Sequence, residues 1–126
     1  MLKHKETTDV ILKTFYAVYN ELGYGFLERV YQNAMFFALQ EAGLTVEAQR
    51  RIDVYFRGKL VGEYFADLFV NDFVILELKS VAKLSEEHEL QLMNYLKATQ
   101  MDVGLLLNFG KEPEFKRRIW DLDVKP

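Results

Sequence analysis

The chain has no cysteine among its 126 residues, which excludes a disulfide framework and a metal site built on thiolates. With only two histidines, His4 and His88, a zinc site is also disfavoured, and we expect both side chains at the surface. No apolar stretch approaches the roughly 20 residues needed to span a bilayer, and no apolar signal core follows the charged N-terminus. These absences predict a cytoplasmic protein that does not enter a membrane.

A basic excess, which nucleic-acid-binding domains usually carry, is missing too, because the formal net charge is −3. This does not exclude a nucleic-acid substrate, since carboxylates that hold a divalent cation make the formal charge more negative than that of the metal-loaded protein. The pairs Arg50-Arg51 and Arg117-Arg118 are candidates for phosphate contacts, although each is equally typical of a solvated edge.

The material for one hydrophobic core is present. A length of 126 residues fits one domain, so we expect residues 1–126 to form a single unit. The 10 Phe and 7 Tyr supply enough bulky apolar surface to exclude global disorder. Most of these rings are expected in the core, and the sequence shows no base-stacking platform.

The spacing of apolar residues changes along the chain from helical to strand-like. Helical spacing over residues 8–22 and about 27–42, with Gly23 and Gly25 in the link, predicts an αα-hairpin. Strands are predicted at residues 52–56, about 60–70 and 73–80. Ser85 is expected to cap a helix that continues to about residue 99, and strands follow at residues 103–109 and about 115–122.

This order predicts an α/β fold. The crossover from strand 73–80 through the helix to strand 103–109 is a β-α-β unit, which normally makes the two strands parallel. Strand 73–80 is almost continuously apolar, so we expect it to be central and buried on both faces. The predicted architecture is a mixed β-sheet flanked by helices, with the αα-hairpin followed by β-β-β-α-β and a possible last strand.

Three charged residues interrupt the most apolar strands. Glu77 and Lys79 are two residues apart, so they share one face of their strand, and Asp67 lies in the preceding strand. Burying such charges costs several kcal/mol per ion unless each is compensated. Two compensations remain open: an ion-pair network with no catalytic role, or a metal ion that leaves the lysine to organise a water molecule.

The length of the loop between these strands decides whether Asp67 and Glu77 meet. A two-residue turn at Asn71-Asp72 would set Asp67 opposite Leu76 and point Glu77 away from it. A three-residue loop over residues 71–73 instead sets Asp67 opposite Glu77. We predict that three-residue loop, or a bulge that corrects the register.

Two carboxylates beside a lysine suit phosphodiester hydrolysis. Mg²⁺ prefers oxygen ligands, here Asp67, Glu77 and the backbone carbonyl of Leu78, and it lowers the pKa of a bound water. Lys79 would orient the attacking water and stabilise developing negative charge. Lys83 and Lys97 flank this site and are candidates for substrate binding.

The spacing of Asp67 and Glu77-Leu78-Lys79 resembles the D-x(n)-(D/E)-x-K signature of the PD-(D/E)XK nuclease superfamily. Over roughly residues 8–120 the chain also resembles the small bacterial and archaeal group named for its GxxExxY motif, present here as the run from Gly25 through Glu28 to Tyr31. One departure is Ala66, which stands where the superfamily name has proline. Further marks of the group are Gln49, Ala66-Asp67, the run from Gln91 to Leu96 and the run from Gly104 to Phe109.

The resemblance implies a restriction-endonuclease-like core with Asp67 and Glu77 as metal-binding acids and Lys79 as the catalytic lysine. It further implies that Glu28 is an additional metal-site or water-positioning acid, and that Gln91 is an active-site residue. Helix capping explains Glu28 equally well, and Tyr31 can equally be a core residue. Tyr95 lies one helical turn after Gln91 on the same face and is a third candidate for substrate binding, beside Lys83 and Lys97.

The leading interpretation is a Mg²⁺-dependent nuclease, with Mn²⁺ as a substitute ion, that hydrolyses phosphodiester bonds in DNA or, second, RNA. The alternative is a catalytically silent nucleic-acid-binding or regulatory module on the same fold, which the mild acidity favours. A third interpretation is a non-nucleolytic assembly protein in which the charged residues only pair with each other. If the substrate is double-stranded, we expect a homodimer.

Overall fold

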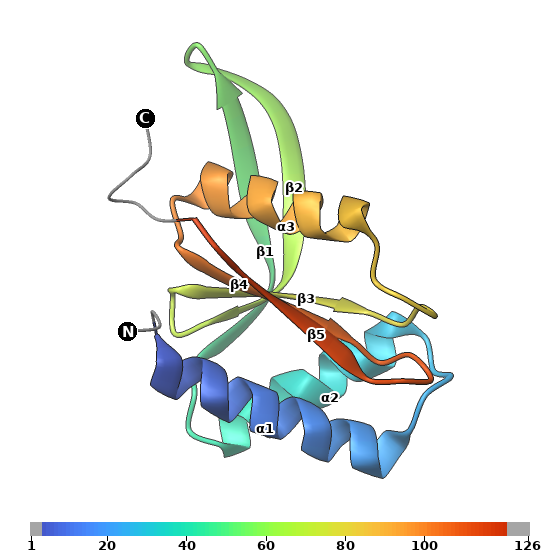
Figure 1. Ribbon diagram of the computed structural model, residues 1–126. Helices are drawn as coiled ribbons and strands as arrows, with labels where there is room; N and C mark the ends of the chain where they lie inside the picture. The colour runs from blue at the N-terminus through green and yellow to red at the C-terminus, as the bar shows by residue number, and fades with distance from the viewer. Residues whose placement is uncertain (1–3, 121–126) are drawn as a thin grey trace.

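The computed structural model describes residues 4–120, and Figure 1 shows helices on both sides of a central sheet. None of the helices in this range is long and apolar enough to cross a membrane. In chain order the elements are α1 (Lys5–Leu22), α2 (Glu28–Glu41), β1 (Val46–Phe56), β2 (Lys59–Val70), β3 (Val74–Lys79), α3 (Glu86–Thr99), β4 (Val103–Asn108) and β5 (Glu114–Ile119).

The sheet has the strand order β1-β2-β3-β4-β5, so β3 is its central strand. β3 and β4 are parallel, as the β-α-β crossover predicts, and the other neighbours are antiparallel. Residues 74–78 of β3 are all buried. The predictions of a mixed sheet with helices packed against it, and of a central buried strand, are confirmed.

β1 is longer than the apolar pattern predicts, because it begins at Val46 rather than at Ile52. The added part carries exposed polar side chains such as Glu47 and Gln49, so apolar alternation does not reveal it. Its pairing with the buried end of β2, from Val46 opposite Val70 onward, makes it a strand. At the other end of the chain, the predicted last strand stops at Ile119, and residues 121–122 lie outside the described residues.

Helices cover both faces of the sheet and form two clusters of buried side chains. α1 and α2 cover one face, where Phe15 and Met35 pack with Leu76 and Leu78 of β3. α3 covers the other face, where its Leu92 and Leu96 pack with Ile75 of β3. Because side chains alternate along a strand, Glu77 and Lys79 point to the same face as Ile75, toward α3.

The loop from β3 to α3 is held by buried polar contacts. Asn108 at the end of β4 is fully buried, accepts a hydrogen bond from the Val81 N–H at 3.0 Å and donates one to the Val81 carbonyl at 2.9 Å. Gly110 is also required here, because a Cβ at this position would lie 2.1 Å from the Val81 carbonyl oxygen. The end of β3, where Lys79 lies, is therefore anchored to β4.

α3 begins at the residue that the sequence predicts. The Ser85 hydroxyl accepts a hydrogen bond from the His88 N–H, and His88 Nδ1 in turn accepts one from the Ser85 N–H at 3.1 Å. The first turn also carries Glu86, Glu87 and Glu89, which the positive end of the helix dipole stabilises. His88 therefore acts as a helix cap.

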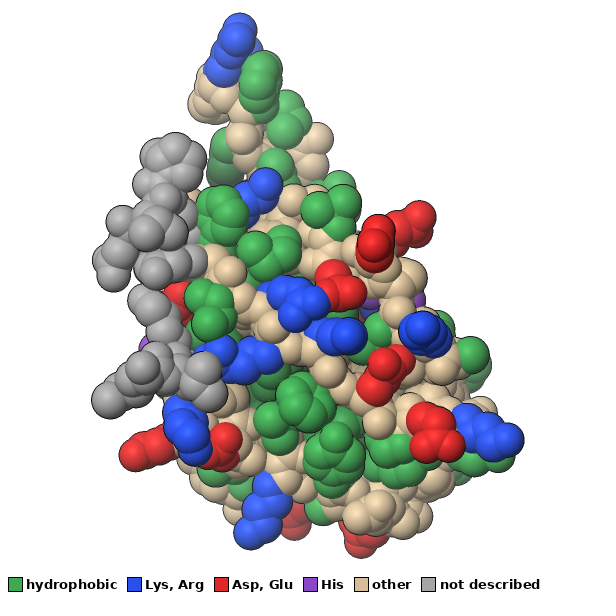
Figure 2. Space-filling view, in the orientation of Figure 1, with side chains coloured by type: hydrophobic (Ala, Val, Ile, Leu, Met, Phe, Trp, Pro, Cys, Tyr) green, Lys and Arg blue, Asp and Glu red, His purple; other side chains and the backbone are tan. Residues whose placement is uncertain are grey.

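β1 and β2 form a hairpin that projects beyond the rest of the molecule, and Figure 2 shows hydrophobic side chains along it. Phe56 pairs with Lys59, so Arg57 and Gly58 make a two-residue turn. Both have positive φ angles, 51° and 78°, as the tight turns of hairpins require. The hairpin leaves the sheet where β2 parts from β3, and this fork is where the charged residues lie.

Candidate active site

The register of β2 and β3 brings Asp67 opposite Glu77. The two strands pair through Leu68 with Leu76 and Val70 with Val74, which leaves a three-residue loop over residues 71–73. Extending this register by one position sets Asp67 against Glu77. The predicted three-residue loop is confirmed, and with it the geometric condition for a shared site.

Beyond Leu68 the paired ladder of β2 and β3 ends, and two carboxylates lie between the strands. Glu77 Oε2 accepts a hydrogen bond from the Asp67 backbone N–H at 2.8 Å. Asp67 Oδ2 accepts one from the Leu78 backbone N–H, also at 2.8 Å. Each carboxylate thus accepts a hydrogen bond from a backbone N–H of the opposite strand, which in a continuous ladder would go to a backbone carbonyl. This reciprocal arrangement holds both side chains in one orientation.

The surroundings of Asp67 and Glu77 do not supply enough positive charge to balance two carboxylates. Glu77 is only 5% exposed, and its burial, together with the charge on Asp67, raises its pKa to about 8. Burial also raises the pKa of Asp67, against the opposing effects of the Leu78 N–H and the charge on Lys79. A cation bound between the two groups would relieve this cost.

Lys79 is near the carboxylates without being paired to them. Its charge lowers the pKa of both Asp67 and Glu77. Yet no ion pair within 4.0 Å joins its Nζ to either residue, in the part of the chain that the structure describes. A closed ion-pair network, one of the two compensations considered from the sequence, therefore does not match the geometry.

The oxygen atoms that remain available suit a hard divalent cation. Within residues 4–120, no hydrogen bond uses Asp67 Oδ1 or Glu77 Oε1. The N–H and C=O of a strand residue point toward the same neighbour, so the Leu78 carbonyl is directed to the same gap as its N–H. Two carboxylates and a carbonyl are a fitting ligand set for Mg²⁺, which usually keeps several waters and takes only one or two protein carboxylates.

Glu28 lies within electrostatic reach of the carboxylate pair but is not part of it. It raises the pKa of both Asp67 and Glu77, and it is exposed in the first turn of α2. Ser80, just after β3, donates a hydrogen bond to the Phe26 carbonyl at 3.0 Å, which brings the start of α2 to the end of β3. Among the described residues, no three Asp, Glu or His side chains are grouped to hold one metal ion. The role of Glu28 as a ligand stays a prediction.

Gln91 and Tyr95 of α3 form the side of the site that faces the helix. Gln91 Nε2 donates a hydrogen bond to the Tyr95 hydroxyl at 2.8 Å. Burial and the charge on Glu77 raise the pKa of Tyr95 to about 12, so this hydroxyl stays protonated at neutral pH. The structure thus brings Tyr95 within electrostatic reach of Glu77, and Gln91 contacts Tyr95.

The two predicted lysines differ in their surroundings. Lys97 of α3 places its Nζ 5.5 Å from the centre of the Trp120 ring and lines a groove that also contains Gln91 and Tyr95. Lys83 is exposed in the loop after β3 and does not line this groove. Both roles in substrate binding stay predictions, and the surroundings favour Lys97.

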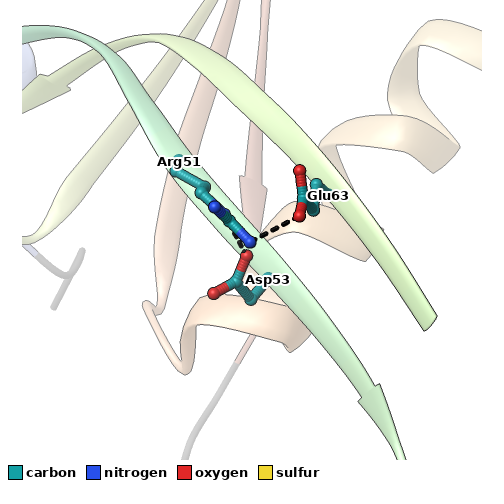
Figure 3. A network of polar contacts seen from close by, with 3 residues as sticks. All are labelled: Arg51, Asp53 and Glu63. Carbon is teal, nitrogen blue, oxygen red and sulfur yellow. Dashed lines mark hydrogen bonds and ion pairs between the residues drawn. The ribbon is translucent and has the colours of Figure 1, made fainter. Parts of the chain in front are cut away.

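Three of the four arginines considered for phosphate contacts have acidic partners. Arg51 donates to Asp53 and to Glu63, each at 2.5 Å (Figure 3). Arg50 pairs with Asp72 at 2.9 Å, and Arg118 pairs with Glu89. These ion pairs mean that Arg50, Arg51 and Arg118 do not form a basic surface ready for a phosphate backbone.

Tyr31, the last residue of the GxxExxY run, is a core residue. It is fully buried, and its ring stacks on Phe109 with centroids 4.3 Å apart. Its hydroxyl donates to the Gly23 carbonyl at 2.6 Å and accepts a hydrogen bond from the Phe26 N–H at 3.2 Å. Tyr31 therefore holds the link between α1 and α2 in place, and this link contacts the end of β3.

We expect Tyr31→Phe to lower the free energy of unfolding by about 1–3 kcal/mol, because both backbone partners of the hydroxyl lose their hydrogen bond. Urea unfolding followed by circular dichroism measures this change. Tyr24→Phe is the matched control, since Tyr24 lies in the same link but is 57% exposed. If Tyr31→Phe instead abolished activity without a change in stability, Tyr31 would belong to the active site.

Some features of the site could not be found from the sequence. The anchoring of the β3 end by Asn108 was hidden in a run that reads only as an apolar strand. The sequence also does not reveal that Tyr55 and Tyr64 are exposed and line the groove beside α3. One feature of the sequence does point to the exposed rings. Residues 60–65 place large apolar side chains on both faces of one strand, whereas a strand with one buried face needs them on that face only.

The five-stranded mixed sheet with helices on both faces, and two acids and a lysine near the fork of its central strands, define a restriction-endonuclease-like α/β fold. The sequence profile of the PD-(D/E)XK nuclease superfamily matches residues 5–119, and the chain belongs to this superfamily. PD-(D/E)XK nucleases generally use divalent metal ions.

Two solved structures have a similar fold. An alkaline exonuclease (LHK-Exo) from Laribacter hongkongensis aligns with 98% of this chain and 74% of its own, with a TM-score of 0.54 and 13% identity. The crystal structure of SSO0001 aligns with 75% of this chain at a TM-score of 0.51 and 16% identity, and the chain covers only 53% of that protein. At these identities the likeness concerns the fold alone. Among curated proteins, no sequence matches the chain significantly.

Proposed function

We propose that this protein is a Mg²⁺-dependent phosphodiesterase that hydrolyses nucleic acid, with DNA as the expected substrate and Mn²⁺ as a substitute ion. The observation that carries the proposal is the Asp67–Glu77 pair, fixed by reciprocal 2.8 Å hydrogen bonds with one oxygen of each carboxylate uncommitted among the described residues. Membership of the PD-(D/E)XK nuclease superfamily supplies the class of reaction.

The residues of the fork have distinct proposed roles. Asp67, Glu77 and the Leu78 carbonyl would hold the cation. When bound, the cation neutralises charge on the phosphate and makes a water molecule a better nucleophile. Lys79 points to the same face as Glu77 and is not committed to an ion pair with either acid, so its ammonium can orient the attacking water and stabilise developing negative charge.

Residues on the two neighbouring helices complete the proposed site. The protonated Tyr95 hydroxyl, within electrostatic reach of Glu77, and the Gln91 amide beside it are hydrogen-bond donors suited to a phosphate or sugar oxygen. Glu28, exposed at the start of α2, would position a water near the carboxylates, whose pKa values its charge raises. We also propose that the chain falls in the GxxExxY group, because Gly25, Glu28 and Tyr31 stand at the spacing of its motif.

We expect Asp67→Asn to reduce metal-dependent cleavage by about 100-fold or more, because the variant removes one of two anionic ligands while keeping the acceptor for the Leu78 N–H. Cleavage of plasmid and single-stranded DNA is measured with Mg²⁺, with Mn²⁺ and with a chelator. A thermal melt with and without Mg²⁺ gives a second readout, since an ion that binds only the native state raises the Tm.

The outcomes of this experiment separate the interpretations. Cleavage that is unchanged in Asp67→Asn would come from a contaminating enzyme and would refute the proposed activity. Binding of nucleic acid by the wild-type protein, without metal-dependent turnover, would assign it to the silent binding modules. A homodimer, proposed for a double-stranded substrate, is tested by sedimentation with and without duplex DNA.

A further inference from the structure

A groove of about 730 Å³ lies between the β1–β2 hairpin and α3. Figure 1 shows α3 running across the base of the hairpin, so one wall of the groove is a helix and the other a pair of strands. The volume lies within the range of about 300–1,000 Å³ that is typical of sites for small ligands. Its lining includes Tyr55, Tyr64, Gln91, Asn94, Tyr95 and Lys97.

The groove adjoins the candidate active site at Tyr95. The Tyr95 side chain lines the groove, and the charges on Glu77 and Asp67 raise the pKa of its hydroxyl, although neither carboxylate lines the groove. A strand whose phosphate lay at the carboxylates could therefore place its neighbouring nucleotide in the groove.

Tyrosine rings provide flat apolar surfaces in this groove. Tyr64 is 47% exposed and Tyr55 is 63% exposed, although both line the groove. The Tyr64 ring lies 5.6 Å from that of the buried Tyr95, which supports it from the α3 side. The sequence predicts no base-stacking platform, and the exposure of these two rings in the groove is the observation that points to one here. The hairpin projects beyond the helices, so its aromatic side chains have no core to enter.

The polar groups of the groove suit nucleobases better than a phosphate backbone. The amides of Gln91 and Asn94 offer donors and acceptors, which match the edges of an unpaired base. Lys97 supplies a positive charge, but the carboxylates of Asp53 and Glu87 also line the groove, and Arg51 is held by Asp53 and Glu63 (Figure 3). Binding here must draw on stacking more than on charge, in agreement with the formal net charge of −3.

We infer that this groove binds unpaired nucleotides of the substrate strand, so that the enzyme prefers single-stranded nucleic acid to a duplex. Bases in a duplex are stacked on each other and paired, and cannot offer their faces to Tyr55 and Tyr64. The inference rests on the proposed function, because it takes the carboxylate pair as the place where the strand is cut.

The test is binding of short single-stranded DNA, of its duplex and of the RNA of the same sequence, by fluorescence anisotropy in a chelator so that no strand is cut. We expect single strands to bind more tightly than the duplex. Tyr64→Leu should weaken single-strand binding by about 5- to 100-fold, because it removes one stacking surface. The fluorescence of 2-aminopurine placed in the strand should change when the strand binds to the wild type, because the base stacks on a tyrosine ring. This change should be lost in Tyr64→Leu.

Phe65→Leu is the matched control for Tyr64→Leu. Phe65 is the next residue of β2, is similarly exposed at 51% and does not line the groove, since neighbouring side chains of a strand point to opposite faces. Single-strand binding should change by no more than about 2-fold in this variant, well below the loss of one stacked base. Thermal melts of both variants verify that each is folded.

Equal binding of duplex and single strand, unaffected by Tyr64→Leu, would overturn the inference. Metal-dependent cleavage that is lost in Asp67→Asn would still stand in that case, so the two failures are distinguishable. Tighter binding of RNA than of DNA would support the groove and identify RNA as the strand it takes.

Discussion

We expect Lys79→Met to lower the rate of metal-dependent cleavage by about 100- to 1,000-fold at saturating Mg²⁺, while the protein still binds the ion. Methionine keeps the aliphatic part of the half-buried lysine side chain and removes only its ammonium group. Because no ion pair joins this ammonium to Asp67 or Glu77 in the described chain, its loss leaves both ligands in place. Single-turnover cleavage measures the rate, and the Mg²⁺-induced rise in Tm measures binding.

Lys83→Met is the control for this prediction, since Lys83 is exposed in the loop that follows β3. Its cleavage rate at saturating substrate should remain within a few fold of the wild-type rate. The assay is best run at a pH above 8, because removing Lys79 also removes a charge that lowers the pKa of both carboxyls. Full activity in Lys79→Met would show that the lysine takes no part in catalysis.

The second large effect concerns the stability of the metal-free protein. Folding raises the pKa of Glu77 from 4.5 to about 8, so between these values the native state binds more protons than the unfolded state. The free energy of unfolding should therefore fall as the pH rises from 4.5 to about 8. Glu77→Gln removes this titration and keeps an oxygen that can accept the Asp67 N–H.

In a chelator at pH 9, we expect Glu77→Gln to have a Tm on the order of 10 °C above the wild type, because a shift of this size corresponds to a few kcal/mol. The difference should vanish at pH 4. Addition of Mg²⁺ at pH 9 should raise the Tm of the wild type and leave that of Glu77→Gln nearly unchanged. The variant should also be inactive.

Glu21→Gln, which alters an exposed glutamate at the end of α1, should follow the wild-type dependence on pH and Mg²⁺. If Glu77→Gln were less stable than the wild type at pH 9, the buried carboxylate would be stabilised by its surroundings. The fork would then have no need of a cation.

Both predictions depend on the same structural feature, the place where β2 leaves β3. A sheet in which the ladder continued past Leu68 would use the Asp67 and Leu78 N–H groups for backbone pairing. Instead these two N–H groups bind the carboxylates, so the opening of the ladder and the positioning of the acids are one arrangement. Ala66 and Leu68 pack on opposite faces of the sheet, which shows that β2 turns at Asp67.

Much of the site follows from local spacing. Glu77 and Lys79 are two positions apart along a strand, so their shared face is independent of the rest of the fold. A three-residue loop sets Asp67 opposite Glu77 by parity alone, and burial of the apolar residues of β2 and β3 selects that register over its neighbour. The β-α-β crossover and the Ser85 cap were likewise predictable, because each depends on a short segment of chain.

Contacts between distant segments could not be predicted in this way. The distance of Lys79 from the acids, the start of β1 at Val46 and the exposure of Tyr64 all depend on where the hairpin and α3 lie relative to the sheet. Those positions result from packing of many side chains at once, which no local pattern encodes. The sequence alone therefore determines which charged residues are present, their order, and the strand face to which each points. The open fork and the groove beside it exist only once the hairpin, the sheet and α3 have packed together.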